Sequence, residues 1–368
     1  MAINLATKYS DKIATAFILG SVVDGRASKD YKFDGASSIL VNTPVTQPLN
    51  DYARTGDNRY GSPTEMQDTQ QRLTLTRDRS FSITIDKGNN KEQMEIKEAG
   101  KMLRLEIDEQ VIPEMDKYAL NKFGDSAGKI EALSSAPTKT TITGALSDGM
   151  VHMSNKKIPA ENRTIFITWT NFGLLRLSPE FIGNEALGQK ALVKGKLGEF
   201  MGADVVPVPG EFLQKTATGS AHFLITHKSA IMQPKTIEDY FVHVNPPGLN
   251  GARLEGRFRF DAFVLGVKSD GVYLAAATSS ARQPAPTNTY ASETKAVTIA
   301  STGANKLRYT LDGSDPRYSA TALEASGASV AVDLAAFSGT TVIIKSVAMS
   351  ATLYTSAITE TSQAVAAG

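Results

Sequence analysis

The chain has 368 residues, of which 41% are hydrophobic, and its 39 basic and 38 acidic residues leave a formal net charge of +1. This length predicts two domains, or one large domain with an appendage, with enough apolar residues for real cores. The balanced charge argues against sequence-specific nucleic-acid binding and against binding to anionic membranes. The sequence has no run of 18 apolar residues, so it predicts no membrane span.

Side chains that commonly carry chemistry are scarce. Cysteine is absent, which excludes disulfides, thiolate metal sites and cysteine nucleophiles. None of the four histidines, His152, His222, His227 and His243, is paired at the spacing of a zinc-binding helix. No phosphate-binding glycine motif and no nucleophile elbow occurs. The sequence therefore predicts no catalytic residue, no metal and no cofactor.

The N-terminal third predicts an arm and a projecting loop. Residues 1–35 mix polar and apolar side chains without a sustained period, which favours an extended arm with a short helix over 9–19. Residues 38–45 predict a strand, and residues 72–87 alternate apolar and polar side chains as a return strand does. The polar stretch between them predicts an extended loop over roughly 46–88. Because an isolated hairpin is marginal in water, we expect a neighbouring subunit to support it.

Charged residues are dense in this loop, and they also form the outer face of a later strand. They are either a solvated surface or ion pairs between subunits, and the second interpretation is favoured because the loop lacks its own core. The candidate inter-subunit contacts are Arg54, Asp57, Arg59, Arg77, Asp78, Arg79, Arg257 and Arg259.

A long helix follows, over roughly 90–123. Asn90 can cap its N-terminus with Gln93 as the capping-box partner, and apolar residues recur at spacings of three and four. Pro113 lies inside the pattern, where it removes a backbone donor. We therefore expect a kink near residues 109–112.

The rest of the chain predicts an α/β lobe and a β-rich tail. Short buried strands and helices over 126–235 indicate a separate lobe, which strands over 236–276 close. Residues 277–288 are small, polar or proline and predict a linker. Residues 289–368 alternate short Val/Ile/Thr strands with turns, which is typical of an immunoglobulin-like or fibronectin-like sandwich.

Several landmarks of the first 276 residues occur in a specific order: "MAINLATKYSDKI", "PLNDYARTGDNRYGSP", "EIDEQVIPEMDKY" and "LEGRFRFDAFVL". This ordered set resembles the major capsid proteins of tailed bacteriophages. The resemblance implies an α+β fold with an N-terminal arm (1–35) and a capsid core (36–276). The core would contain the extended loop, a spine helix, an axial domain (126–235) and a peripheral domain (236–276).

The same resemblance implies what the chain does and where. Many copies would assemble as pentamers and hexamers into an icosahedral shell that encloses the genome. The protein would be found in the virion, and in the host cytoplasm during assembly. Separate scaffolding and portal proteins are the expected partners.

The tail contains "YTLDGSDP" from Tyr309 to Pro316 and "IIKSVAM" from Ile343 to Met349. These segments resemble the C-terminal domain of chitobiases and hexosaminidases, which accompanies the catalytic module and implies at most a weak glycan contact. Asp312 and Asp315 predict a hairpin turn and a strand-end corner, not catalysis. We expect the tail to project outward through the linker, so that a chain truncated after Gln283 still assembles and the tail folds alone.

Two alternatives remain open. A carbohydrate-active enzyme or lectin would need a pocket of carboxylates and aromatics within 126–276, and the single tryptophan, Trp169, argues against it. A phage tail-tube protein is disfavoured by the long helix, since tube subunits are mainly β. The triangulation number, the host and the ligand of the tail stay undetermined.

Overall fold

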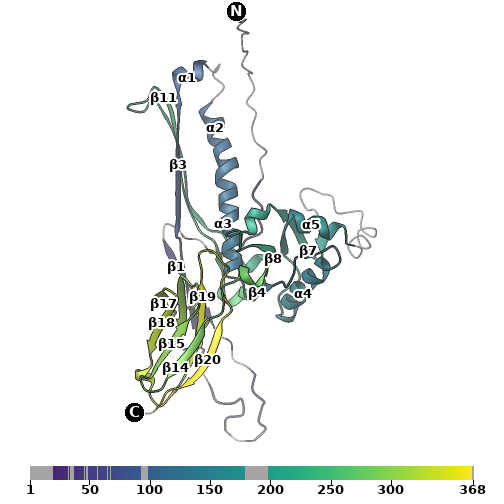
Figure 1. Cartoon of the computed structure of the whole chain (residues 1–368), viewed down its shortest axis with the longest axis vertical. Coiled ribbons are helices and arrows are strands. Elements are labelled where there is room, and N and C mark those ends of the chain that lie inside the picture. Colours follow the sequence, from purple (N-terminus) through teal and green to yellow (C-terminus); the bar gives the residue numbers. More distant parts are fainter. Residues whose placement is uncertain are drawn as a thin grey trace, which may run out of the picture.

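The computed structural model describes residues 20–31, 33, 37–44, 46, 49–55, 57–63, 65–66, 68–92, 98–178 and 198–366. The arm helix expected over 9–19 lies outside these residues. Figure 1 shows an elongated stem of strands and helices, an α/β lobe at its side and a β-sandwich at its lower end. Within the described ranges, no helix is both long and apolar enough to cross a membrane.

The extended loop begins and ends in a two-stranded sheet, as expected. Strand β1 (Ser38–Pro44) pairs antiparallel with β2 (Asp68–Thr74), so that the ends of the excursion over 45–67 lie side by side. Leu73 and Val41 are buried in a small apolar cluster at its base. The hairpin therefore has one anchored end and a long projecting tip.

The return strand differs from the continuous strand expected over 72–87. It stops at Thr74, and a new strand, β3 (Arg77–Asp86), joins a different sheet with the order β10-β11-β3. In that sheet β10 (Lys235–Val244) and β11 (Gly251–Phe260) form a long antiparallel hairpin. The stem in Figure 1 consists of this sheet and the helices packed on it.

A buried carboxylate explains why the strand is divided. Asp261, only 1% exposed, accepts hydrogen bonds from both the backbone N–H and the hydroxyl of Thr76, each at 2.7 Å. It also accepts from the Tyr118 hydroxyl and the Ala262 N–H, each at 2.8 Å. Burial raises the pKa of Tyr118 to about 12, so its hydroxyl stays a donor. Asp261 thus joins the loop, the stem helix and the end of β11.

The stem helix begins later than predicted. Helix α1 (Lys87–Glu92) is separate, and α2 (Ala99–Glu106) starts only after Glu98, whose backbone is extended at φ −74° and ψ 130°. Asp86 accepts a hydrogen bond at the start of α1, from the Asn89 N–H at 3.0 Å, and Gln93, the predicted capping-box partner of Asn90, lies outside the described residues. A side chain that caps a first turn can do so from the end of a strand, which a helical pattern does not reveal.

In place of the kink expected near residues 109–112, the stem helix contains a π-helical turn. Residues Ile107–Val111 are π-helical and lead directly into α3 (Ile112–Asp125), with Pro113 in its first turn. Proline fits the first turn of a helix, where its missing N–H would have no partner. The wider π turn lets α2 and α3 continue as one rod, as Figure 1 shows.

The α/β lobe contains a mixed sheet with the order β4-β13-β8-β5-β7-β6, covered by two helices. Its strands are β4 (Lys129–Ala132), β5 (Arg163–Thr168), β6 (Glu199–Phe200), β7 (Ala203–Val208), β8 (Ala221–His227) and β13 (Val272–Ala276). Its helices are α4 (Ile142–Asn155) and α5 (Trp169–Arg176). Alternate residues of β5 face opposite cores, because Ile165 and Ile167 pack under α4 while Phe166 packs toward α3.

Short elements complete the body. Strands β9 (Ile231–Met232) and β12 (Phe263–Val264) pair beside the stem. Single 3₁₀ turns occur at Gly210–Leu213, Lys228–Ala230, Gly266–Gly271, Ser279–Ala281 and Ala335–Phe337.

The C-terminal part is a two-layer sandwich of seven strands with its own core. The strands are β14 (Thr287–Ala291), β15 (Ala296–Ala300), β16 (Lys306–Thr310), β17 (Leu323–Ser326), β18 (Ser329–Asp333), β19 (Thr341–Met349) and β20 (Thr359–Ala364). One sheet has the order β14-β15-β18 and the other β17-β16-β19-β20. Ile299, Leu307 and Ile344 are fully buried between them.

The connection into the sandwich differs from the free linker expected over 277–288. Ala281 is fully buried and Gln283 is only 2% exposed. Gln283 donates its backbone N–H to the Tyr354 carbonyl at 2.8 Å and its amide to the Thr302 carbonyl at 2.7 Å. The sandwich therefore rests against the body and does not hang from a tether.

The first described residues are fixed to the stem helix by a second buried carboxylate. Asp116, 2% exposed, accepts hydrogen bonds from the Val22 N–H at 2.6 Å and the Ser21 hydroxyl at 2.9 Å. Burial raises the pKa of Asp116, because the charged form loses hydration that these two bonds only partly replace.

This shift predicts a pH dependence of stability. The pKa of Asp116 is higher in the folded than in the unfolded chain, so its contribution is largest at low pH and is lost as pH rises through the folded pKa. In urea unfolding between pH 4 and 7.5, the wild type is expected to lose stability relative to Asp116→Asn as pH rises. Asp24→Asn is the control and is expected to show no trend over this range, because Lys29 lowers the pKa of Asp24 and its titration falls below the range. A stability difference between wild type and Asp116→Asn that is constant with pH would contradict the prediction.

Candidate assembly surfaces

The first candidate surface is the outer edge of the stem sheet, residues Tyr240–Val244 of β10, called here the edge-strand surface. Four of its five residues are large and apolar, and they are exposed, with Phe241 at 54% and Val244 at 75%. Among the described strands, β10 pairs only with β11. An edge strand with free backbone groups and apolar side chains favours pairing with another chain.

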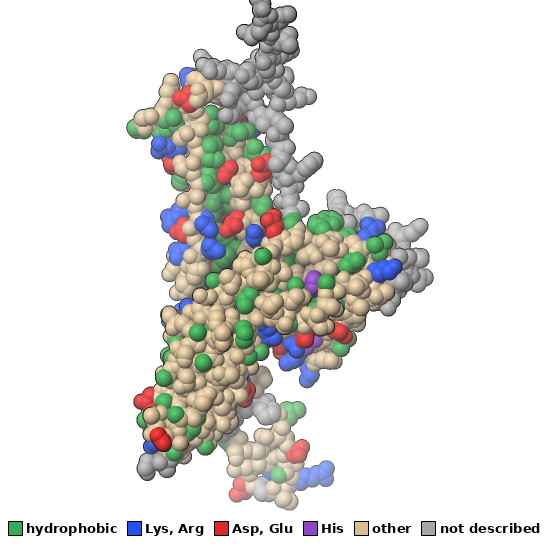
Figure 2. Space-filling model, in the orientation of Figure 1, with side chains coloured by type: hydrophobic (Ala, Val, Ile, Leu, Met, Phe, Trp, Pro, Cys, Tyr) green, Lys and Arg blue, Asp and Glu red, His purple; other side chains and the backbone are tan. Residues whose placement is uncertain are grey.

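The two faces of β10 differ in chemistry. Tyr240 packs edge-on against Phe258 with ring centroids 5.3 Å apart, on the face that carries the stem helix. On the opposite face Phe241 stacks on His243, which lies 3.3 Å from Glu255. Figure 2 shows apolar side chains along the stem, with basic and acidic side chains beside them. An apolar strip with a charged rim is the usual composition of a protein interface.

The second candidate surface lies at the tip of the extended loop and comprises Leu49, Tyr52, Tyr60 and Met66, called here the loop surface. All four side chains are exposed, Tyr60 at 85%. The tip is folded on itself: Tyr52 and Tyr60 pack edge to face at 5.1 Å, and the Ala53 N–H donates to the Arg59 carbonyl at 3.0 Å. The loop thus holds these apolar side chains in a fixed arrangement and leaves them exposed.

The two surfaces lie far apart on the molecule. The β10–β11 hairpin ends beside α1, at the upper end of the stem in Figure 1. The described part of the loop tip projects at the opposite, lower end.

Five of the eight charged candidates lie in or beside the stem sheet, and four of these already have partners within the chain. Arg257 forms a bidentate ion pair with Asp78, in which Nη2 lies 2.6 Å from Oδ2 and Nε lies 3.0 Å from Oδ1. Arg79 lies 3.6 Å from Glu114, and Arg77 lies over the Tyr118 ring at 4.5 Å. The Arg257 guanidinium holds the pKa of Asp78 below its usual range. Arg259 lies opposite Asp78 in the sheet register.

The remaining three candidates, Arg54, Asp57 and Arg59, lie in the loop tip and are exposed. In the sequence they lie between Tyr52 and Tyr60 of the loop surface. The hydrogen bond from the Ala53 N–H to the Arg59 carbonyl and the contact between Tyr52 and Tyr60 hold this segment together.

The two carboxylates of the tail shape turns, as predicted. Asp312 accepts from the Ser314 N–H at 2.9 Å and from the Thr321 hydroxyl at 2.8 Å, while Asp315 pairs with Arg317 at 2.8 Å. The turn at Asp312 is not a tight hairpin, because residues 311–322 separate β16 from β17. Within the described ranges, no group of three His, Asp or Glu residues is placed to hold a metal ion.

Sequence reasoning missed the edge-strand surface, although its signal was present. The run "YFVHV" alternates poorly and carries apolar residues on both faces, which is unusual for a strand that is covered on one side only. Its position at a sheet edge, however, follows only from the pairing of β11 with β3.

No protein-family model and no curated protein matches the sequence. Solved structures do match in fold. A chain of Mycobacterium phage Che8 is 17% identical with a TM-score of 0.59, and the match covers 74% of this chain and 98% of that one. A chain from the capsid of Cyanophage P-SCSP1u is 12% identical with a TM-score of 0.60, covering 74% and 93%. A chain from the mature capsid of bacteriophage PhiM1 is 10% identical with a TM-score of 0.55, covering 74% and 92%.

These matches establish the fold. Mixed helix and sheet in this arrangement is the fold of phage capsid subunits. The match extends over nearly the whole length of the three matched chains. The share of this chain that each match covers is close to the share formed by residues 1–276.

Proposed function

We propose that this chain is the structural, non-enzymatic subunit of an icosahedral capsid of a tailed bacteriophage. Copies would assemble as pentamers and hexamers around the genome and remain in the virion. The observation that carries this proposal is the fold match, which spans at least 92% of each of the three matched chains, two of them from structures titled as phage capsids.

The two candidate surfaces support a specific mode of self-association. One is the edge strand of a sheet and the other is a loop tip, and they lie at opposite ends of one elongated subunit. A contact between two unlike patches is heterologous, and such contacts close into rings when the rotation between copies allows it. We therefore place the loop surface of one copy on the edge-strand surface of the next. Arg54, Asp57 and Arg59 would lie at the charged rim of that contact, near Arg253 and Glu255 of the neighbour.

The C-terminal sandwich is part of the proposal as an immunoglobulin-like domain. Seven antiparallel strands in sheets of three and four, around one apolar core, support this assignment. Separate scaffolding and portal proteins are the proposed partners during assembly. A weak glycan contact by the sandwich is the remaining partner proposal.

Electron microscopy of the purified chain tests the function, and one substitution tests the mode of association. Val244→Lys puts a charge on the exposed edge without touching a core. It is expected to reduce shell yield by at least about tenfold, the factor that about 1.4 kcal/mol per contact produces. Circular dichroism and the melting temperature are expected to stay as in the wild type.

The matched control is Phe337→Lys, which adds the same charge at an exposed apolar residue of the sandwich. It is expected to leave shells intact. If the wild type gives only small globular particles under every assembly condition, the capsid function is wrong. If shells form normally with Val244→Lys, the function stands and the edge-strand contact is wrong.

A further inference from the structure

One end of the sandwich is hydrogen-bonded to the residues that lead into it from the body. The Tyr354 N–H donates to the Ala281 carbonyl at 2.9 Å, and the Gln283 N–H donates back to the Tyr354 carbonyl at 2.8 Å. Arg282, at the entry of the sandwich, and Tyr354 thereby form a parallel β-bridge. The connection between β19 and β20, residues 350–358, is fixed beside the entry of the sandwich.

This connection inserts an aromatic ring into the core of the body. Tyr354 is fully buried in the same apolar cluster as Phe123 and Leu274. Its hydroxyl donates to the Leu213 carbonyl at 2.9 Å and lies 3.2 Å from the Asn121 amide oxygen. Burial raises the pKa of Tyr354 far above its ordinary value, so it remains a neutral donor. The apolar core of the body thus includes a residue of the tail.

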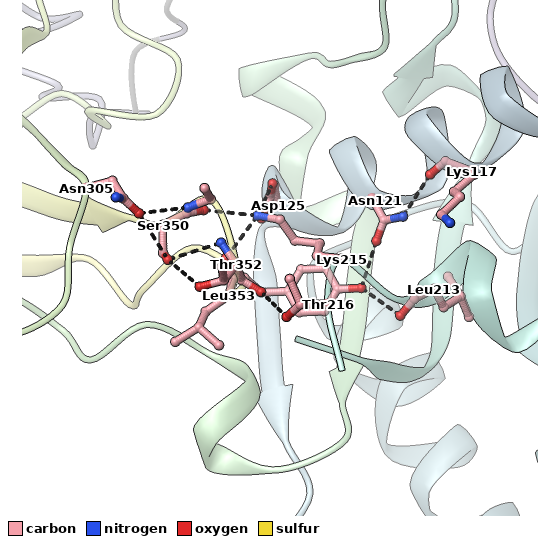
Figure 3. A network of polar contacts seen from close by, with 12 residues as sticks. Lys117, Asn121, Asp125, Leu213, Lys215, Thr216, Asn305, Ser350, Thr352 and Leu353 are labelled. Carbon is pink, nitrogen blue, oxygen red and sulfur yellow. Dashed lines mark hydrogen bonds and ion pairs between the residues drawn. The ribbon is translucent and has the colours of Figure 1, made fainter. Parts of the chain in front are cut away.

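The partly buried ammonium group of Lys215 lies beside this ring. Lys215 pairs with both oxygens of Asp125 at the end of α3, at 2.7 and 2.9 Å. Its remaining donor capacity goes to the tail, to the carbonyls of Leu353 at 2.9 Å and Ser350 at 3.3 Å. Figure 3 shows this arrangement, with the tail loop lying directly against Lys215 and Asp125. Three elements distant in sequence therefore share one charge pair.

A second contact is made by the turn that contains Asp315. Tyr318 is 9% exposed, and its hydroxyl donates to the Ser126 carbonyl just after α3. The Arg317 guanidinium donates to the Ala127 carbonyl at 2.5 Å. Three residues after Arg317, the Ala320 N–H donates to the Gln70 carbonyl of β2 at 3.1 Å. One turn of the sandwich thus reaches both the end of the stem helix and the base of the extended loop.

From these contacts we infer that the sandwich is a fixed clamp, which locks the end of α3 to the base of the extended loop. The body surface around Asp125 and Lys215 is an interaction surface whose partner is the tail of the same chain. This inference concerns the single subunit, and it holds whether or not the subunit assembles into a capsid.

The clamp also restricts where the sandwich can bind anything else. The connections β15–β16 and β19–β20 lie at one end of the sandwich, where the Ala351 N–H donates to Asn305 at 3.0 Å, and the β16–β17 connection contacts the body from the other end of β16. End loops are the usual binding site of immunoglobulin-like sandwiches. At the other end, Lys295 donates to Ser338 at 3.0 Å, which joins the connections β14–β15 and β18–β19. A ligand such as a glycan would have to use that far end or the faces of the sheets.

Hydrogen exchange of the full-length chain tests the clamp. Tyr354→Ala is expected to speed exchange by about tenfold or more in residues 350–356, at the end of α3 and in β2, the factor for about 1.4 kcal/mol of lost local stability. Protection in β15 and β19 should stay, because the sandwich has its own core. Tyr60→Ala, which removes an exposed ring from the loop tip, is the control and should change none of these segments. Unchanged exchange at α3 and β2 in Tyr354→Ala would overturn the inference.

Two further measurements do not depend on that variant folding. Lys215→Met keeps the volume of the stem and removes the charge, and it is expected to loosen the same segments to a smaller extent. In the wild type, residues 277–286 are expected to resist a protease that cuts exposed loops. Early release of an intact sandwich fragment from the wild type would show a free tether and overturn the clamp. A failure to form shells would leave both results interpretable, because they are read on the monomer.

Discussion

A chain truncated after Gln283 is expected to lose the stable fold of its body, and with it the ability to assemble. Truncation removes Tyr354 and Tyr318, which are buried in the same cluster as the stem helix and the lobe sheet. Loss of a buried aromatic side chain costs about 3–5 kcal/mol. Two such losses are comparable with the whole stability of a domain, about 5–15 kcal/mol. Thermal unfolding and sedimentation of the truncated chain measure this directly.

This expectation reverses the one drawn from the sequence, in which residues 1–283 form a separable body. The control is an insertion of a short Gly-Ser segment after Gly339, an exposed turn at the far end of the sandwich with φ +75°. It disturbs the sandwich without touching the body and is expected to leave assembly unchanged. Wild-type shells from the truncated chain would show that the docking of the tail contributes little.

Replacing Asp261 by Ala is expected to lower the free energy of unfolding by about 3 kcal/mol. The substitution leaves the Tyr118 hydroxyl and the Ala262 N–H without an acceptor in a buried site, and a buried donor left unpaired costs about 1–3 kcal/mol. Thr76 also loses both of its bonds to the carboxylate, but it is exposed and can bind water instead. Urea unfolding followed by circular dichroism gives the difference.

Asp57→Ala, in the exposed loop tip, is the matched control and should stay within about 0.5 kcal/mol of the wild type. Asp261→Asn keeps one acceptor oxygen and is expected to fall between the two. A loss below about 1 kcal/mol for Asp261→Ala would show that the division between β2 and β3 does not depend on this carboxylate.

The predicted ion-pair residues show what a single sequence reveals about a site. The sequence indicates Asp78 and Arg257 as contacts between subunits, because the loop lacks its own core and the later strand has a charged outer face. They are partners of each other, 179 residues apart, across adjacent strands. The contribution of the loop residues Arg54, Asp57 and Arg59 to contacts between subunits stays a prediction.

The sequence by itself determined the local elements. Alternation predicted the strands on either side of the loop and those of the sandwich, and the apolar spacing predicted the stem helix, although the kink expected from Pro113 is a π-helical turn instead. These features depend on backbone geometry and on which face of an element is buried, and both repeat within a few residues.

Only the tertiary structure decided which elements meet. The strand break at Thr76 depends on Asp261, the lobe sheet is completed by β13, and Tyr354 enters the core of the body. Residues 277–286 have the composition of a tether, yet they are packed because distant backbone groups satisfy their polar atoms. A pattern of polar and apolar residues predicts which side chains are covered by other parts of the protein. It does not report what covers it, because that partner lies tens to hundreds of residues away.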